Sequence, residues 1–158
     1  MSAGSGIEIE RKFLVRVDAL PASARQGGAS FEQGYLSFEP AVRVRASDEN
    51  GEKRAWLTIK GPGVIERVEL EYAIPYDDAR AMLPLCKAAL TKIRRRVRVG
   101  AHTWDLDELT GAHAGLWLAE VELTAADEPF ERPPWLGDEV SHDPRYANAA
   151  LARAGQPP

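Results

Sequence analysis

The chain has 158 residues, 44% of them hydrophobic, and a formal net charge of -4 at pH 7. This length and apolar content suit one domain with a buried core, which we assign to residues 1–158. The negative charge argues against nucleic acid as a partner. The sequence also contains no run long enough to cross a membrane and, at Met1–Gly6, no signal-peptide pattern, so we expect a cytoplasmic protein.

The first predicted strand, Ile7–Val15, alternates charged and apolar residues. Side chains two residues apart point to the same face of a strand, so Glu8, Glu10 and Lys12 share one face. Two carboxylates and an ammonium group on one strip form a ligand set for hard cations and phosphate. A Pro-containing turn or short helix is predicted to follow near Asp18–Ala24.

Seven further segments are predicted strands, and six of them repeat this alternation. The segments are Phe31–Phe38, Ala41–Ala46, Arg54–Lys60, Arg67–Ile74, Thr91–Val99, Thr103–Leu109 and Leu116–Leu123. Their alternating charged or polar positions are Arg43 and Arg45, Thr58 and Lys60, Glu69 and Glu71, Lys92, Arg94 and Arg96, Asp105 and Asp107, and Glu120 and Glu122. The pair Asn50-Gly51 predicts a hairpin turn between two of these strands.

Two helices are predicted, one from about Asp77 to Leu90 and one in the region of Asp143 to Ala154. The first carries the single cysteine, Cys86, on its apolar stripe, where we expect it to be a core residue. The second has Asp143 as its expected N-cap, and a rigid turn is predicted before it at 133–137. Three histidines fit no metal-ligand spacing and are expected in surface loops: His102, His113 and His142.

The opposite faces of the predicted strands are apolar and must be covered. Their residues include Ile7, Ile9, Phe13, Val42, Val44, Leu57, Ile59, Val68, Leu70, Trp104, Leu106, Val121 and Leu123. Helices packed outside these faces leave the charged faces inside. The pattern therefore predicts an α+β, mainly β, fold: about eight antiparallel strands closed into a tunnel with a charged lumen, and the C-terminal helix near one tunnel end.

An antiparallel sheet with one hydrated face gives the same alternation, and it is the simpler interpretation. However, acids occupy four of the charged strips and bases the other three. Like charges opposite each other across strands are destabilising, so an ordinary hydrated face is expected to mix them. Separation by sign favours metal ions that bridge the acids to a polyanion held by the bases.

Glu8-Ile9-Glu10-Arg11-Lys12 has the Glu-x-Glu-x-Lys form that opens the triphosphate tunnel metalloenzymes, also called the CYTH superfamily. Further segments resemble the strand motifs of that family in the family's order: 33–36, 43–45, 58–60, 69–71, 92–94, 104–107 and 120–122. The closing segment 143–148 is similar to the C-terminal helix of the short bacterial members, which include inorganic triphosphatases. The resemblance implies an eight-stranded antiparallel tunnel that hydrolyses inorganic tripolyphosphate to pyrophosphate and orthophosphate.

The resemblance also implies a role for each strip. The phosphate chain would be held by Lys12, Arg43, Arg45, Lys60, Lys92 and Arg94. Divalent metal would be held by Glu8, Glu10, Asp107, Glu120 and Glu122, with support from Glu69, Glu71 and Asp105. Oxygen ligands without a His or Cys cluster favour Mg2+ or Mn2+. Lys92 and Tyr35 are candidate general bases, although Lys92 could simply bind phosphate, Tyr35 could simply bind a carboxylate, and a carboxylate or the metal could activate the water.

Several alternatives stay open. The family also includes hydrolases of organic triphosphates, such as thiamine triphosphate and nucleoside triphosphates, and class IV adenylate cyclases. Strand alternation places only one aromatic side chain available for base stacking, Trp56, on the lumen side, which favours inorganic tripolyphosphate as the substrate. A non-catalytic polyphosphate-binding module belongs to a different functional class, and a homodimer is possible.

Overall fold

The computed structural model describes residues 6–158, so the expectation about the start of the chain at residues 1–5 lies outside the described residues. Within this range the strands are β1 (Ile7–Val15), β2 (Ala29–Phe38), β3 (Ala41–Glu49), β4 (Glu52–Lys60), β5 (Glu66–Ala73), β6 (Ala88–Val99), β7 (His102–Thr110), β8 (Trp117–Glu122) and β9 (Leu136–Glu139). The α-helices are α1 (Tyr76–Met82) and α2 (Asn148–Ala154). No helix in this range has the length and apolarity to span a membrane.

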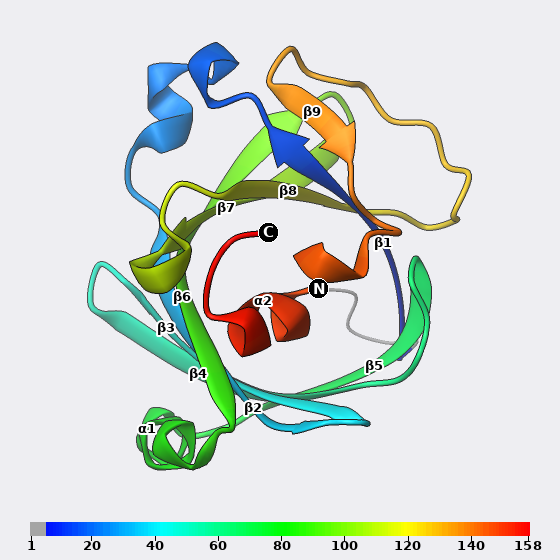
Figure 1. Ribbon diagram of the computed structural model, residues 1–158. Helices are drawn as coiled ribbons and strands as arrows, with labels where there is room; N and C mark the ends of the chain where they lie inside the picture. Colours follow the sequence, from blue (N-terminus) through cyan, green and yellow to red (C-terminus); the bar gives the residue numbers. More distant parts are fainter. Residues whose placement is uncertain (1–5) are drawn as a thin grey trace.

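The strands form a closed antiparallel barrel, seen nearly end-on in Figure 1. Its order is β5-β4-β3-β2-β6-β7-β8-β1, and β1 pairs with β5 to close the ring. This confirms the predicted eight-stranded barrel. The short ninth strand, β9, pairs with the end of β1 and was not predicted. It has only four residues and follows two prolines, so no alternation marks it in the sequence.

The predicted helix from Asp77 to Leu90 was too long. Helix α1 ends at Met82 and continues as a 3-10 turn over Leu83–Leu85, after which the chain is extended at Cys86. Pro84 cannot donate a backbone hydrogen bond within a helix, which explains the early end. The last predicted helical residues instead belong to β6, where Leu90 pairs with Gln33 of β2.

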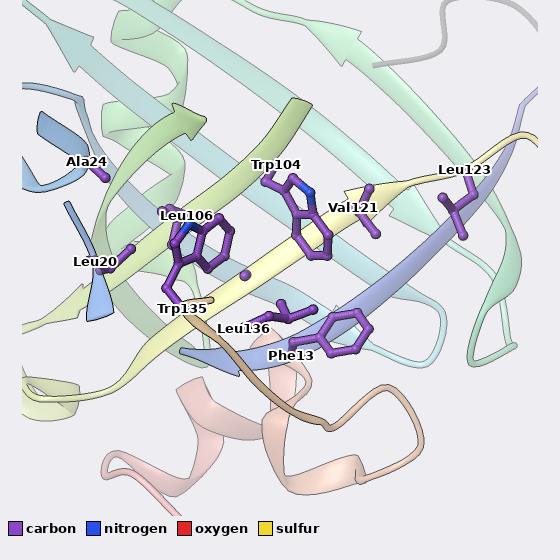
Figure 2. Packing of buried hydrophobic residues seen from close by; sticks show 10 residues of the cluster. Phe13, Leu20, Ala24, Trp104, Leu106, Val121, Leu123, Trp135 and Leu136 are labelled. Atoms are coloured by element: carbon purple, nitrogen blue, oxygen red, sulfur yellow. The ribbon is translucent and has the colours of Figure 1, made fainter. Parts of the chain in front are cut away.

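Two groups of elements pack against the apolar outer faces of the barrel strands. Ala79 of α1 and Leu83 of the following 3-10 turn pack against β3 and β4, where the sequence predicted a helix. The outer faces of β1, β7 and β8 are covered differently, by 3-10 turns and the irregular segment at 123–136 (Figure 2). There Trp135 packs edge-on against Trp104, with ring centroids 5.7 Å apart. Burying a large apolar side chain stabilises the folded state by about 1.5–3 kcal/mol. This irregular segment can therefore cover the apolar face of the barrel without forming a helix.

The C-terminal helix lies inside one end of the barrel, as Figure 1 shows, and not on its outer wall. Asp143 caps a 3-10 turn at Pro144–Tyr146, and α2 begins only at Asn148. Leu151 of α2 is 0% exposed. The inner positions at this end form an apolar layer that receives it, made of Leu14, Tyr35, Leu90, Leu109 and Leu118. The prediction of a C-terminal helix near one tunnel end is therefore confirmed, and the apolar layer that receives this helix inside the barrel is a feature that the alternation of charged and apolar residues did not predict.

Two of the three histidines do not lie in surface loops as predicted: His102 is the first residue of β7, and His113 is buried. His113 is only 2% exposed, because the 3-10 turn Gly111–His113 packs against α2. Its Nε2 donates a hydrogen bond to the carbonyl oxygen of Leu151 over 2.6 Å. A lone histidine gives no sequence signal for such a contact across 38 residues of chain. His113 thus secures the last turn of α2 inside the barrel.

Candidate active site

The inward-facing side chains of the barrel line a cavity of about 420 Å³. Strand alternation explains its composition, because residues two apart on each strand reach the same lumen. Above the apolar layer that holds α2, these positions are almost all charged. The lining includes Glu8, Glu10, Arg43, Arg45, Lys60, Glu69, Glu71, Arg94, Asp105, Glu120 and Glu122, with Phe31, Trp56 and Asn148.

Lys92, Arg94 and Asp107 form a compact buried group, here called the Asp107 network. Lys92 Nζ donates to Asp107 Oδ2 over 2.7 Å, and Arg94 Nε donates to Asp107 Oδ1 over 2.7 Å. Burial and the neighbouring charge of Arg94 lower the pKa of Lys92 to about 7. Burial alone would raise the pKa of Asp107, but Arg94 and Lys92 outweigh it and hold that pKa well below its usual range. Lys92 of the Asp107 network therefore changes its charge near neutral pH.

Both oxygens of Asp107 are occupied by these cations. Its expected role as a metal ligand stays a prediction, and its contacts in this structure are those of a counter-ion. Asp105, the next inward residue of β7, pairs with Arg94 over 3.4 Å. The basic strip on β6 is therefore neutralised largely by its neighbour β7.

Arg43 and Arg45 of β3 extend the cationic side of the lumen. Arg43 is buried and lies 3.9 Å from Glu69 of β5. Arg45 donates from Nε to Gln33 Oε1 over 3.0 Å. We call Arg43, Arg45, Lys92 and Arg94 the basic wall.

Glu8 and Glu10 of β1 and Glu120 and Glu122 of β8 form the acid wall. The two strands are neighbours, with Glu10 opposite Glu122 and Lys12 opposite Glu120. Burial raises the pKa of Glu8 to about 7, helped by a side-chain hydrogen bond with Glu69. Burial and the charge of Glu120 likewise raise the pKa of Glu10 to about 7. Burial alone would also raise the pKa of Glu120, but Lys12 and Arg94 outweigh it and hold that pKa well below its usual range.

The cations that do reach the acid wall are mostly distant. Lys12 Nζ lies 3.4 Å from Glu120 Oε1, and Lys60 Nζ lies 3.7 Å from Glu8 Oε2. Both of these carboxylate oxygens are buried and have no hydrogen-bond partner among residues 6–158. Carboxylate oxygens are the ligands that Mg2+ and Mn2+ prefer. The donor chemistry therefore fits a hard divalent cation, although no group of three His, Cys, Asp or Glu within 6–158 already encloses one.

The remaining predicted residues are also inside the barrel. Lys60 lines the cavity, and Lys12 Nζ donates to the carbonyl oxygen of Tyr146 over 3.0 Å. Tyr35 lies deeper, in the apolar layer, with its ring 5.7 Å from that of Phe38. It also lines a smaller cavity of about 280 Å³ between the barrel and the C-terminal segment. The barrel therefore brings every predicted site residue to one lumen, with Tyr35 at its apolar end.

Sequence reasoning left several lumen residues out of the predicted site. Arg67 Nη2 donates to Glu10 Oε1 over 2.8 Å, and it precedes the predicted inward residue Glu69 by two positions. Phe31 and Gln33 lie on the lumen side of β2, opposite Ser47 and Arg45 of β3. Asn148 reaches the lumen from the start of α2. Strand parity could have found the first three, whereas Asn148 depends on how the tail folds back.

Comparison with known proteins gives four concordant results. The model of the CYTH domain family matches residues 6–150. An inorganic triphosphatase of Acetivibrio thermocellus is 40% identical over 153 residues, covering 94% of both chains. An inorganic triphosphatase of Nitrosomonas europaea is 32% identical over 150 residues, covering 92% of this chain and 96% of the relative. The crystal structure of the inorganic triphosphatase NE1496 superimposes with a TM-score of 0.61 at 30% identity, covering 92% of this chain and 93% of that one.

Proposed function

The chain belongs to the CYTH domain family, and from this premise we propose that it hydrolyses inorganic tripolyphosphate to pyrophosphate and orthophosphate with a divalent metal ion. The observation that carries the proposal is the division of one lumen into two opposed sides. The basic wall offers buried cations, and the acid wall offers carboxylates with unpartnered oxygens. A phosphate chain would supply negative charge to the basic wall, and a divalent cation would supply positive charge to the acid wall.

The cationic side chains hold the phosphate chain. Arg43, Arg45 and Arg94 present guanidinium groups whose planar forks match phosphate oxygens. Lys12 and Lys60 add mobile point charges from β1 and β4. Binding to several fixed cations orients the terminal phosphorus for attack, which is the main catalytic contribution in phosphoryl transfer.

Glu8, Glu10, Glu120 and Glu122 would hold the divalent metal, and we propose Mg2+ or Mn2+. When bound, the cation supplies charge neutralisation along the phosphate chain and polarisation of water. Arg67, which contacts Glu10, orients this carboxylate on the acid wall. The lumen itself limits access of bulk water to the reacting groups.

We propose Lys92 as the residue that accepts a proton from the attacking water. Its lowered pKa, about 7, leaves a substantial neutral fraction at physiological pH. Asp107 holds the amine in place through the 2.7 Å contact. Tyr35 stays a second candidate for this role, at the apolar end of the lumen.

An organic triphosphate is the second candidate substrate, for a specific reason. The rings of Phe31 and Trp56 stack at the wall of the lumen, with centroids 6.3 Å apart and planes 21° from parallel. Both also line an adjoining cavity of about 690 Å³ rich in arginine. An aromatic group attached to the triphosphate could stack on this pair. Thiamine triphosphate and ATP are therefore the informative competitors.

Orthophosphate release decides between these functions. The purified protein is assayed with tripolyphosphate, ATP, thiamine triphosphate and pyrophosphate, with Mg2+, with Mn2+ and with excess chelator. We expect the highest kcat/KM with tripolyphosphate and no turnover in chelator. Higher efficiency with an organic triphosphate would assign that substrate instead, cyclic AMP from ATP would indicate a cyclase, and binding without hydrolysis would indicate a polyphosphate-binding module. The homodimer and the cytoplasmic location stay predictions.

A further inference from the structure

Arg45 differs from the other buried cations of the lumen. Lys92 pairs with Asp107, Arg43 with Glu69, and Lys60 with Glu8. Arg45 is 7% exposed, yet no carboxylate within residues 6–158 forms an ion pair with it. Removing a charge from water without a partner is costly, so this arrangement needs an explanation.

Two uncharged side chains of β2 hold Arg45 in place of a carboxylate. Gln33, directly opposite on the neighbouring strand, accepts a hydrogen bond from Arg45 Nε through its Oε1 over 3.0 Å. Phe31, two residues earlier, places its ring centroid 5.1 Å from Arg45 Cζ. The guanidinium is thus oriented by an amide and an aromatic face, and its two terminal nitrogens stay available as donors.

The same contact fixes the orientation of the Gln33 amide. Arg45 Nε can only donate, so the Gln33 atom facing it must be the oxygen, and the amide nitrogen faces elsewhere. Gln33 is 0% exposed, and its Nε2 has no hydrogen-bond partner among residues 6–158. A buried donor without a partner destabilises a folded protein, so this amide nitrogen needs an acceptor. A phosphate oxygen is the acceptor that a phosphate-binding lumen would provide.

We propose that Gln33 is a positioning residue for the triphosphate. It orients Arg45 through a neutral acceptor that leaves the full guanidinium charge to the phosphate chain, and its Nε2 donates to a phosphate oxygen. This inference rests on the proposed binding of a triphosphate in the lumen. It explains why glutamine and not glutamate stands at 33, since a carboxylate there would neutralise Arg45 before the substrate arrives.

Two variants separate the charge effect from simple geometry. Gln33→Glu keeps an acceptor for Arg45 Nε but adds a negative charge, whereas Gln33→Met removes the acceptor and the donor at similar volume. If charge availability matters, Gln33→Glu weakens binding more than Gln33→Met. If Gln33 only supports the position of Arg45, the order is reversed. Gln156→Glu adds the same charge at an exposed position of the tail and serves as the matched control.

The readout is the dissociation constant of inorganic tripolyphosphate, measured by calorimetry in chelator, with thermal unfolding of each variant as a check on folding. We expect Gln33→Glu to raise the dissociation constant about tenfold or more, consistent with the loss of a charged hydrogen bond. Gln33→Met should raise it less, and Gln156→Glu should leave it unchanged. In an Arg45→Met background, Gln33→Glu should have little further effect, because the two residues act as one unit.

The outcomes distinguish this inference from the proposed function. Equal binding by Gln33→Glu and the unmodified protein overturns the inference, as does a larger loss in Gln33→Met. Absence of tripolyphosphate binding to the unmodified protein overturns it too. Binding with the expected order of variants, but no orthophosphate release with metal, supports the role of Gln33 and overturns only the proposed hydrolysis.

Discussion

The Asp107 network and the acid wall face one lumen, but their charges are paired to very different degrees. In the network, Lys92 and Arg94 both contact Asp107 over 2.7 Å. On the acid wall, Glu120 and Glu8 have their nearest cations at 3.4 and 3.7 Å. One group is complete within the protein, and the other has unsatisfied oxygens. The difference teaches that one barrel can pair the charges around Asp107 closely and still leave buried carboxylate oxygens of Glu8 and Glu120 without a hydrogen-bond partner among residues 6–158. In the function proposed above, a divalent cation completes the second group.

The pKa directions of Asp107, Glu8 and Glu10 express the same contrast. The pKa of Asp107 lies well below its usual range, because Arg94 and Lys92 outweigh the effect of burial. The pKa values of Glu8 and Glu10 are raised to about 7, with burial as the largest cause. Ionisation is therefore favoured at Asp107 and opposed at Glu8 and Glu10. Glu120 of the acid wall follows Asp107, because Lys12 and Arg94 outweigh the effect of its burial and hold its pKa well below its usual range.

The largest expected effect comes from removing the lysine of the Asp107 network. Lys92→Ala should lower kcat with tripolyphosphate by about 10²–10⁴-fold, the usual contribution of general acid–base catalysis. Arg96, on the same strip, is the control because its side chain is 78% exposed. Arg96→Ala should stay within about threefold of the unmodified enzyme, since exposed ion pairs contribute little. Similar losses in both variants would show that the strip acts only through its total charge.

The pH dependence of kcat tests the role of Lys92 within this first prediction. A neutral Lys92 acting as base predicts a rate that rises with pH and levels off above about 7. A protonated Lys92 that only binds phosphate predicts binding that weakens over the same range. The two profiles have opposite slopes, so one titration of kcat and KM separates them.

The second prediction compares stability on the two sides. Asp107→Asn should lower the free energy of unfolding by about 3–5 kcal/mol, because it leaves Lys92 and Arg94 buried without their counter-ion. Glu10→Gln should leave the stability of the metal-free protein unchanged or raise it, because its ionised form is already disfavoured. Urea unfolding in chelator measures both. Equal destabilisation would contradict the view that only one side is complete.

The third prediction concerns the pH dependence of stability without metal. Glu8 and Glu10 have folded-state pKa values near 7 against 4.5 in their ordinary state, so the folded protein binds more protons between these values. Their contribution to stability should therefore fall as pH rises from 4.5 to about 7. Above this range Lys92 and Lys60 act in the opposite sense, because their pKa values are lowered to about 7 and about 8 and the folded protein binds fewer protons there than the unfolded chain. Asp107 also acts in the opposite sense to the two glutamates, since its contribution is lost only as pH falls below 3.8.

A double variant isolates this effect. Glu8→Gln with Glu10→Gln should flatten the decline, as measured by urea unfolding at several pH values in chelator. Added Mg2+ should stabilise the unmodified protein most above pH 7, where the carboxylates are ionised. An unchanged slope in the double variant would mean that other groups cause it.

The smallest effect is expected at the exposed end of the acid wall. Glu122→Gln should lower kcat/KM about tenfold, less than Glu8→Gln, because water screens charges at an exposed position. Glu8 is more buried, and its Oε2 has no hydrogen-bond partner among residues 6–158. Parallel assays in Mg2+ test the order, and the opposite ranking would place the cation nearer the mouth of the lumen.

The alternation of charged and apolar residues was sufficient to predict the barrel and the sidedness of its strands. Glu10 and Glu122, more than a hundred positions apart, do lie opposite each other. The sequence did not reveal Gln33 as a partner of Arg45, because that contact depends on the register of two strands. It also did not place α2 inside the barrel, because Leu90, which lines the end that receives α2, was assigned to a helix. Residues whose role depends on long-range pairing are those that a local pattern misses.

The pairing of β1 has a consequence for the synthesis of the chain. This first strand lies between β5 and β8 in the ring and also pairs with β9, so two of its partners, β8 and β9, leave the ribosome near the end of translation. Contacts so distant in sequence fold slowly, and until they form, the growing sheet keeps an open edge that can join other chains. A chain whose translation stops before Trp117 lacks both β8 and β9, and it would expose the edge of β1. Slow, late closure therefore makes prematurely terminated chains of this protein prone to aggregation.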